Sequence, residues 1–372
     1  MIDDQLCVCV QRPHAPWVAP REFFEKQGPA SSIDLPTYVK RCCCTMRMHQ
    51  RKQIKTLASF TNPRRFLIFK KLIAIHRHGT AATDAPAVAF YECNHFECGI
   101  KGRNTCHQPG PTTVRIRPST PIPPSVARAY RRAYRAATGF TDHLVGKLLD
   151  ALEAKNLTYN TTVLLMADHG WSLGEHGQWC KQSNTELVVR IPLVVRAPWL
   201  AQSHGRRVDH LVEAVDVFPT LLDLHGVAIP ETVHSLEGTS FAPMLRAPTT
   251  PPPTKNASFS QYPRCFAADN TTFDPANQCT KTDSSAFGAM GYSIRTREWR
   301  YTRWVKWDGR TLRGLDDKLV GEELYAHAGD DGEDNNLFEN ANLAGDPQYA
   351  DVVTRLHEAL LRGWRGALLK AL

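Results

Sequence analysis

The sequence predicts an α/β fold followed by a small antiparallel β subdomain, and three observations support this prediction. First, a long amphipathic stretch at 125–157 is followed by a short apolar run at 163–167. Second, another apolar run at 191–195 precedes a second helical pattern at 212–225. Third, the segment at 291–307 alternates in polarity. Alternating helices and strands are typical of a sheet covered by helices, and alternating polarity is typical of antiparallel strands.

The stretch from Ser125 to Leu157 is expected to form one long helix. Its apolar residues recur at intervals of three and four, which places them on one helical face. They include Val126, Ala129, Tyr130, Ala133, Tyr134, Ala137, Leu144, Leu148, Leu149 and Leu152. Ser125 follows two prolines and is the expected N-cap. Gly139 marks the place where we expect a kink.

Two short apolar runs are expected to form core strands. The run from Val163 to Ala167 is wholly apolar and follows a helix, a pattern that predicts a buried parallel strand. The run from Ile191 to Val195 predicts a second strand. The pattern VEAVDVFPTLLDLH, from Val212 to His225, predicts the helix that follows.

The C-terminal region is expected to form a small antiparallel sheet with a closing helix. Alternating segments at 291–296 and 300–307 flank Arg297-Glu298-Trp299 and predict a β-hairpin. Glu323-Leu324-Tyr325 is a candidate third strand. The amphipathic segment at 351–372 predicts the closing helix.

Positive charge is concentrated in one stretch of the chain. The formal net charge is +8, from 45 Lys and Arg against 37 Asp and Glu. Residues 35–83 contain eleven Lys and Arg and no acidic residue, so the rest of the chain carries −3. The segment at 40–84 could be a basic arm for nucleic acid or a membrane, but it shows no sustained helical or strand period. We favour an insertion outside the fold, and we predict neither a nucleic-acid nor a membrane partner.

The cysteines give weaker signals. Cys93, Cys98 and Cys106 with His107 have the composition of a zinc site. Their spacing does not match the usual pairs of cysteines separated by a few residues, so we assign no zinc there. Cys265 and Cys279 flank a polar loop, and their separation permits a local disulfide without requiring one.

Sequons for N-glycosylation begin at Asn156, Asn160, Asn256 and Asn270. Four of them favour a protein of the secretory pathway. The sequence starts MIDDQLCVCV and shows no signal peptide, so we expect that the natural N-terminus lies elsewhere.

The loop after the first core strand carries the residues best suited to chemistry. It reads DHGWSLGEHGQWCKQSNTE from position 168. Asp168 and His169 could be adjacent ligands of a divalent cation, because a carboxylate suits a hard ion such as calcium. Lys181 supplies a point charge suited to a tetrahedral anion. An ordinary polar turn is the alternative for Asp-His-Gly alone. Two residues in between are expected to be structural: Glu175 and His176.

The complete loop resembles the late metal-binding motif of sulfatases in the alkaline phosphatase superfamily, of the iduronate-2-sulfatase type. The shared pattern is Asp-His-Gly, then Gly-x-His-Gly, then Trp-x-Lys. Further segments resemble the family in the same order, at 12–23, 141–152, 191–195, 215–224, 260–264, 290–296, 300–302 and 323–325. The resemblance covers roughly 11–38 and 85–345 and skips the basic insertion.

This resemblance implies a helix-flanked mixed sheet of the sulfatase and alkaline phosphatase type, present here incompletely, with a small C-terminal antiparallel β subdomain. We divide the chain accordingly into four parts. Residues 1–39 are a core fragment with the active-site histidine, and 40–84 are the basic insertion. Residues 85–255 form the α/β core with the metal loop, and 256–372 form the C-terminal subdomain with its hairpin and closing helix.

The resemblance also implies roles for four residues. Asp168 and His169 would be calcium ligands, and Lys181 would bind the sulfate. His14 would be a catalytic residue that contacts the sulfate or the leaving-group oxygen. The alternative for His14 is a turn histidine between two prolines.

One part of the family pattern is missing. Sulfatases of this type convert a cysteine or serine in a C/S-x-P-S-R motif to formylglycine, and the 372 residues contain no such motif. The family's first metal ligands, a pair of aspartates, are not assigned either, since Asp3-Asp4 has no apolar strand before it. We therefore expect the later part of a larger hydrolase, which by itself has no hydrolytic activity because it lacks the nucleophile.

The implied activity of the intact protein is hydrolysis of a sulfate ester on a sulfated carbohydrate, such as a 2-O-sulfated uronic acid in a glycosaminoglycan. The implied location is lysosomal or extracellular. Two alternatives stay open. One is a phosphodiesterase or phosphonate hydrolase of the same superfamily. The other is a non-catalytic protein that binds sulfated polysaccharide through Lys181, His14 and the basic insertion.

Overall fold

The computed structural model describes residues 10, 17–35, 85–86, 89, 98–100, 122–228, 236–267, 269, 271–274, 277–330 and 338–366. Several predicted features lie outside the described residues: His14, the insertion at 40–84, Asn270, and the candidate zinc residues Cys93, Cys106 and His107. In the described part of the chain, no helix combines the length and the apolar character that a membrane span requires.

The long helix α2 spans Pro124–Ala154 and confirms the amphipathic pattern. It starts one residue before the expected N-cap, because Pro123 is the N-cap and Pro124 occupies the first turn. Proline suits this position, since its missing N–H has no partner in a first turn. The helix runs through Gly139 without interruption. Its N-terminal half is the buried half and includes Val126, Ala127, Tyr130, Ala133, Ala136 and Ala137.

A short parallel strand pair and a helix pack against the start of α2. Strand β1 (Trp17–Ala19) pairs in parallel with β2 (Cys98–Ile100), and α1 (Arg21–Glu25) follows β1 directly. The Trp17 ring meets the rings of Tyr130 and Tyr134 edge-on, with centroids 6.1 and 5.6 Å apart. Phe23 and Phe24 of α1 join the same apolar cluster, which fixes this N-terminal segment on α2.

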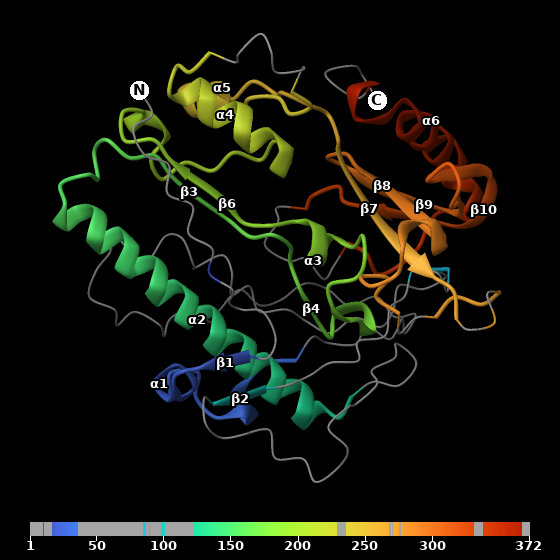
Figure 1. Ribbon diagram of the computed structural model, residues 1–372, viewed down its shortest axis with the longest axis horizontal. Coiled ribbons are helices and arrows are strands. Elements are labelled where there is room, and N and C mark those ends of the chain that lie inside the picture. Colours follow the sequence, from blue (N-terminus) through green and yellow to red (C-terminus); the bar gives the residue numbers. More distant parts are fainter. Residues whose placement is uncertain are drawn as a thin grey trace, which may run out of the picture.

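The two core strands exist, but the predicted parallel direction is wrong. Strand β3 (Val163–Met166) pairs antiparallel with β6 (Leu193–Arg196), and both strands are mostly half-buried. An apolar run indicates that a strand is buried, but it does not show whether the strand runs parallel or antiparallel to its neighbour. That direction depends on how the chain connects the two strands. Here residues 167–192 turn the chain back beside β3. In Figure 1, β3 and β6 lie between α2 on one side and α4 and α5 on the other.

The helices after β6 are shorter than the sequence pattern. The expected helix at 212–225 begins with a 3₁₀ turn at Ala214–Asp216 and continues as α4 (Val217–Leu224). Helix α5 spans Ala242–Arg246. Leu224 and Ala242 pack with Ala197, just beyond β6, in one apolar cluster. Burial of Asp216 explains the break, because its carboxylate accepts hydrogen bonds from the backbone N–H groups of Glu213 and Thr239.

The C-terminal part is an antiparallel sheet, as predicted, and it has four strands. Its order is β10 (Arg313–Ala326), β9 (Trp299–Asp308), β8 (Phe287–Arg295) and β7 (Ser258–Cys265). The predicted hairpin is β8–β9, and the candidate third strand at 323–325 is the end of β10. Helix α6 (Ala350–Gly366) lies along this sheet in Figure 1 and buries Leu356 and Ala359 in the sheet's apolar cluster.

The structure shows the disulfide that the sequence left open, and it confirms the predicted fold class. Cys265 at the end of β7 forms a disulfide with Cys279, with their Cα atoms 5.7 Å apart. The described strands include both parallel and antiparallel pairs and are accompanied by helices, which confirms the α/β fold class with a C-terminal antiparallel sheet.

Candidate active site

The loop from residue 167 to residue 185 folds back on itself through a hairpin of two short strands. Strand β4 (Ser172–Leu173) pairs antiparallel with β5 (Trp179–Cys180), and a 3₁₀ turn at Glu175–Gly177 connects them. Gly174 has φ 106°, a conformation that glycine adopts without steric cost. Because Ser172 lies opposite Cys180, the hairpin returns Lys181 to the neighbourhood of the Asp168-His169 pair at the end of β3.

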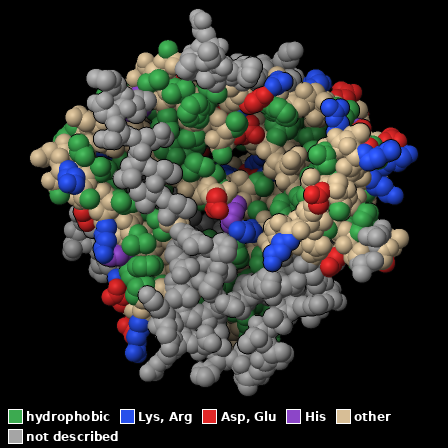
Figure 2. Space-filling model, viewed as in Figure 1, with side chains coloured by type: hydrophobic (Ala, Val, Ile, Leu, Met, Phe, Trp, Pro, Cys, Tyr) green, Lys and Arg blue, Asp and Glu red, His purple; other side chains and the backbone are tan. Residues whose placement is uncertain are grey.

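The structure brings Asp168, His169 and Lys181 into contact. Lys181 Nζ lies 2.6 Å from His169 Nε2, and Asp168 Oδ2 lies 3.2 Å from the same nitrogen. Asp168 Oδ1 accepts a 3.0 Å hydrogen bond from the His169 backbone N–H. Figure 2 shows acidic, histidine and basic side chains side by side near the centre of one face. The three side chains thus form one cluster, called the loop cluster below.

The hydrogen bonds of His169 determine which ring nitrogen is available. Nδ1 lies 2.9 Å from the Gly170 carbonyl oxygen, which can only accept, so Nδ1 carries the proton. In the neutral ring, Nε2 therefore carries a lone pair that accepts from the Lys181 ammonium group, with Asp168 Oδ2 3.2 Å away. An imidazole lone pair beside a carboxylate oxygen is a donor pair suited to a cation.

Exposure divides the loop cluster into an open and a sheltered side. The Asp168 side chain is 85% exposed and the His169 side chain is 28% exposed. Lys181 is half-buried, and its Nζ lies 5.7 Å from the centre of the Trp171 ring. Burial lowers the pKa of Lys181, and the Asp168 carboxylate partly opposes this shift.

Close packing holds the Asp-His-Gly turn in place. The Gly170 N–H donates a 2.7 Å hydrogen bond to the Val188 carbonyl in helix α3 (Glu186–Val189). A Cβ atom at position 170 would lie 1.9 Å from the Leu187 carbonyl oxygen. Only glycine allows this approach, so α3 fixes the turn that carries Asp168 and His169.

Glu175 and His176 are buried, at 1% and 2% exposure. The Glu175 carboxylate accepts hydrogen bonds from Arg131 Nη1 at 3.1 Å and from the Leu173 N–H at 2.5 Å. Burial is the main cause of a lowered pKa at His176. The contacts of Glu175 tie the hairpin to α2, which is the behaviour of a structural residue.

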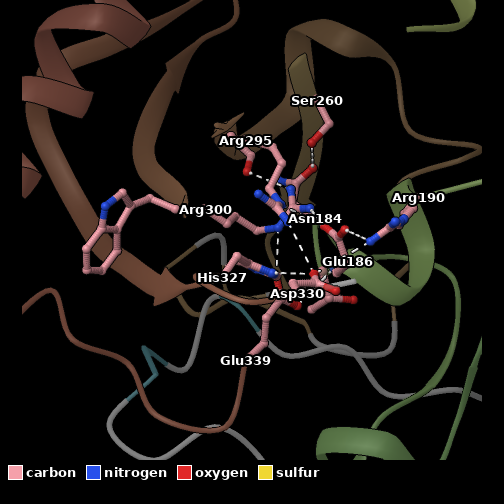
Figure 3. A network of polar contacts seen from close by, with 12 residues as sticks. Asn184, Glu186, Arg190, Ser260, Arg295, Arg300, His327, Asp330 and Glu339 are labelled. Atoms are coloured by element: carbon pink, nitrogen blue, oxygen red, sulfur yellow. Dashed lines mark hydrogen bonds and ion pairs between the residues drawn. The ribbon is translucent and has the colours of Figure 1, made fainter. Parts of the chain in front are cut away.

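A second cluster of polar side chains was not predicted from the sequence. Glu186, His327 and Glu339 place their ligand-type atoms within 4.8 Å of one another, and all three are buried. Figure 3 shows them converging with Arg190, Arg295, Arg300 and Asp330. We call these seven residues the buried network. Its members come from α3, β8, β9 and loops up to 153 residues apart in sequence, so no local spacing could have revealed it.

The buried network pairs carboxylates with guanidinium groups. Arg300 contacts Glu186 and donates a 2.7 Å hydrogen bond to Glu339. Arg295 donates to Glu186 at 3.1 Å. Burial acts to raise the pKa of Glu186, but Arg300 and Arg295 outweigh it and hold the pKa well below its usual value. Because the guanidinium groups already match the carboxylates, a divalent cation would add uncompensated charge here. The buried network therefore fits an internal cross-link better than a metal site.

The comparisons with known proteins decide the family. The sequence model of the sulfatase family matches residues 7–227, which is more than half of the chain. The chain belongs to the sulfatase family. This match includes Asp168, His169 and Lys181 and ends before the C-terminal sheet.

The chain is also similar in sequence to individual sulfatases. The chain is 31% identical to iduronate 2-sulfatase of Mus musculus over 268 residues, which are 61% of this chain and 47% of that protein. It is 37% identical to choline-sulfatase of Rhizobium meliloti over 119 residues, 32% of this chain and 22% of that one. This sulfatase-family chain spans about half the length of the iduronate 2-sulfatases it matches.

Solved structures of similar proteins include a 2-O GAG sulfatase, at 27% identity and a TM-score of 0.49, covering 66% of this chain and 45% of that chain. They also include the phosphonate monoester hydrolase of Silicibacter pomeroyi, at 22% identity and a TM-score of 0.49, covering 68% of this chain and 44% of that chain.

Proposed function

We propose that the loop cluster is the cation- and sulfate-binding part of a sulfuric ester hydrolase. The observation that carries this proposal is the contact of Lys181 Nζ and Asp168 Oδ2 with His169 Nε2, at 2.6 and 3.2 Å, in a chain of the sulfatase family. A carboxylate oxygen and an imidazole lone pair offer two ligands to a divalent cation. The adjacent ammonium group offers hydrogen bonds to an anion.

The donor set fits calcium as part of a larger coordination shell. Calcium binds six to eight ligand atoms, most of them oxygen, so Asp168 and His169 would supply only some of them. When bound, the cation would polarise the sulfate and stabilise the negative charge that develops on it. The Gly170 carbonyl keeps the His169 proton on Nδ1, so that Nε2 carries the lone pair that a ligand atom needs.

Lys181 is proposed to bind a sulfate oxygen. It is held beside Trp171, where partial burial strengthens an ionic hydrogen bond relative to bulk water. In the structure its Nζ donates to His169 Nε2. If Asp168 and His169 hold a cation, the Lys181 ammonium group would be available to donate a hydrogen bond to a sulfate oxygen. His14 stays a predicted catalytic residue that protonates or contacts the leaving oxygen.

The proposed substrate class is a sulfated carbohydrate, with a 2-O-sulfated uronic acid as the first candidate. Support comes from the iduronate 2-sulfatases, which match the chain at 31% and 30% identity over about 60% of its length. A phosphonate or phosphate diester is the alternative substrate of the same superfamily. Tighter binding of a phosphonate monoester than of the matched sulfate ester would favour that alternative.

We place the protein in the secretory pathway, with lysosomal or extracellular destinations. The Cys265–Cys279 disulfide supports this proposal, since disulfides persist in oxidising compartments. The acceptor residues of two sequons, Asn156 and Asn160, are exposed after α2, where a glycan could be attached.

A binding measurement with the full 372-residue chain tests the proposal. We expect inorganic sulfate to bind in the presence of calcium, and we expect Lys181→Ala to weaken this binding by about tenfold or more, because one charged hydrogen bond is lost. Lys147→Ala, at an exposed position of α2, is the matched control and should bind as the parent does. Calorimetric titration measures both. Equal sulfate affinity in the parent and Lys181→Ala would refute the proposed role of Lys181.

Turnover is a separate question. The 372 residues contain no C/S-x-P-S-R motif, so we expect this chain alone to bind a sulfate ester without hydrolysing it. The assay is release of chromophore from an aryl sulfate. Turnover that disappears in Asp168→Ala would show that the chain uses another nucleophile.

A further inference from the structure

We propose that Arg264, on strand β7 of the C-terminal sheet, is a positioning residue for Lys181. This inference rests on the proposed function, because it gives Arg264 the task of holding the backbone beside the sulfate-binding lysine. Arg264 contacts the main chain of the residue that follows Lys181. Its effect would be transmitted through the main chain of Gln182.

The segment after Lys181 docks on the C-terminal sheet through alternate residues. The Gln182 carbonyl accepts from Arg264, Asn184 donates from Nδ2 to the Gly291 carbonyl at 3.0 Å, and Glu186 contacts Arg295 and Arg300. Figure 3 shows Asn184 and Glu186 pointing into the C-terminal sheet from this segment.

The buried Arg264 side chain holds main-chain carbonyl groups of two separate segments. It is 1% exposed, and its Nη1 donates a 2.9 Å hydrogen bond to the Gln182 carbonyl. Its Nη2 donates to the Ala89 carbonyl at 3.1 Å. The guanidinium carbon lies 4.9 Å from the centre of the Trp304 ring and 5.3 Å from that of Tyr262. Stacking and two carbonyl contacts leave the guanidinium group little freedom, and a lysine could not reproduce this arrangement.

The residues on both sides of Lys181 are held by contacts to other parts of the structure. On its N-terminal side, the buried residue Cys180 is paired with Ser172 in the β4–β5 hairpin. On its C-terminal side, the Lys181 N–H donates a 3.0 Å hydrogen bond to Gln182 Oε1, and the Gln182 carbonyl is held by Arg264. Release of Gln182 would free the backbone on one side of Lys181. The ammonium group would then sample positions outside reach of a bound sulfate, and affinity would fall.

A double-mutant cycle on sulfate affinity tests this inference in the full-length chain. We expect Arg264→Lys to weaken sulfate binding by about tenfold when Lys181 is present, the cost of one charge-assisted contact. In the Lys181→Ala background, the same substitution should change the affinity less than about twofold, because the group that it positions is gone. Equal effects in both backgrounds would overturn the inference and leave a merely structural role.

A matched control separates positioning from general loss of stability. Arg303→Lys, on β9, removes guanidinium contacts to Asp316 and Glu322 on β10 without changing a contact to Gln182. It should lower the thermal midpoint and leave the affinity for sulfate unchanged. A weakened affinity equal to that of Arg264→Lys would count against a specific role of Arg264.

Hydrogen exchange gives a measurement that does not depend on sulfate. Arg264→Lys should speed amide exchange in residues 180–183 more than in the remaining hairpin, and Arg303→Lys should not. If the parent chain binds no sulfate, the proposed function fails, and exchange still reports whether Arg264 holds this segment. Unchanged exchange at 180–183 in Arg264→Lys would refute the inference whatever the outcome for sulfate.

Discussion

The loop cluster and the buried network contain the same types of side chain in different surroundings. Each combines carboxylate, imidazole and positively charged groups within hydrogen-bonding distance. In the loop cluster the Asp168 side chain is 85% exposed, whereas in the buried network the Glu186 and Glu339 side chains are 5% and 1% exposed. The same chemistry can therefore bind a ligand at one place and cross-link the fold at another.

Charge matching explains this difference. In the buried network, Arg295 and Arg300 lie directly against Glu186, and Arg300 also contacts Glu339. Desolvated charges are tolerated only when they are paired in this way. In the loop cluster, water can solvate Asp168, so the cluster needs no complete set of internal partners. The exposed side chains of the loop cluster can therefore exchange water for a ligand. The buried network cannot, because its carboxylates are already paired with guanidinium groups.

The largest expected effect is loss of stability in the buried network. Arg300→Met keeps a similar volume but leaves Glu186 and Glu339 without their main cation, so we expect the free energy of unfolding to fall by about 3–5 kcal/mol. Denaturant unfolding measures this value. Arg21→Ala breaks the exposed pair with Glu25 and should cost less than about 0.5 kcal/mol. Similar losses in the two variants would remove the distinction between the regions.

The second expected effect is a pH dependence that originates in the buried network. The guanidinium groups hold the pKa of Glu186 and of Glu339 below the ordinary value of 4.5 in the folded state. A depressed folded-state pKa means stabilisation that is present above pH 4.5 and is lost as the pH falls further.

Unfolding measured between pH 7 and pH 3 tests this effect. Stability should fall below pH 4.5, and the fall should be shallower in Glu186→Gln, which has no carboxyl group to protonate. An identical pH profile in the variant would show that Glu186 is not responsible.

The smallest effect on stability is expected in the loop cluster. Asp168→Asn changes a side chain that is 85% exposed, so the free energy of unfolding should change by less than about 0.5 kcal/mol. The variant should nevertheless lose the rise in thermal midpoint that calcium produces in the parent chain. Thermal unfolding with and without calcium measures both quantities. A calcium response that survives in Asp168→Asn would place the cation elsewhere.

Some features were predictable because their signal is local in the sequence. The loop cluster lies within fourteen residues, from Asp168 to Lys181, and its motif could be recognised without coordinates. The amphipathic periods of α2 and α6 and the β8–β9 hairpin are local patterns of the same kind. The direction of β3 was not predictable, because an apolar run shows that a strand is buried but not which neighbour it pairs with.

The sequence by itself determined the identity of the ligand-type residues, the helical and strand periods, and the family. It did so because these properties depend on side-chain type and short spacing. Only the tertiary structure decided that Arg264 reaches the Gln182 carbonyl, and that Glu186 meets Arg300 and Glu339 across more than a hundred residues. Contacts of this kind depend on how separate elements pack, and packing is set by the summed burial of many side chains rather than by any one segment.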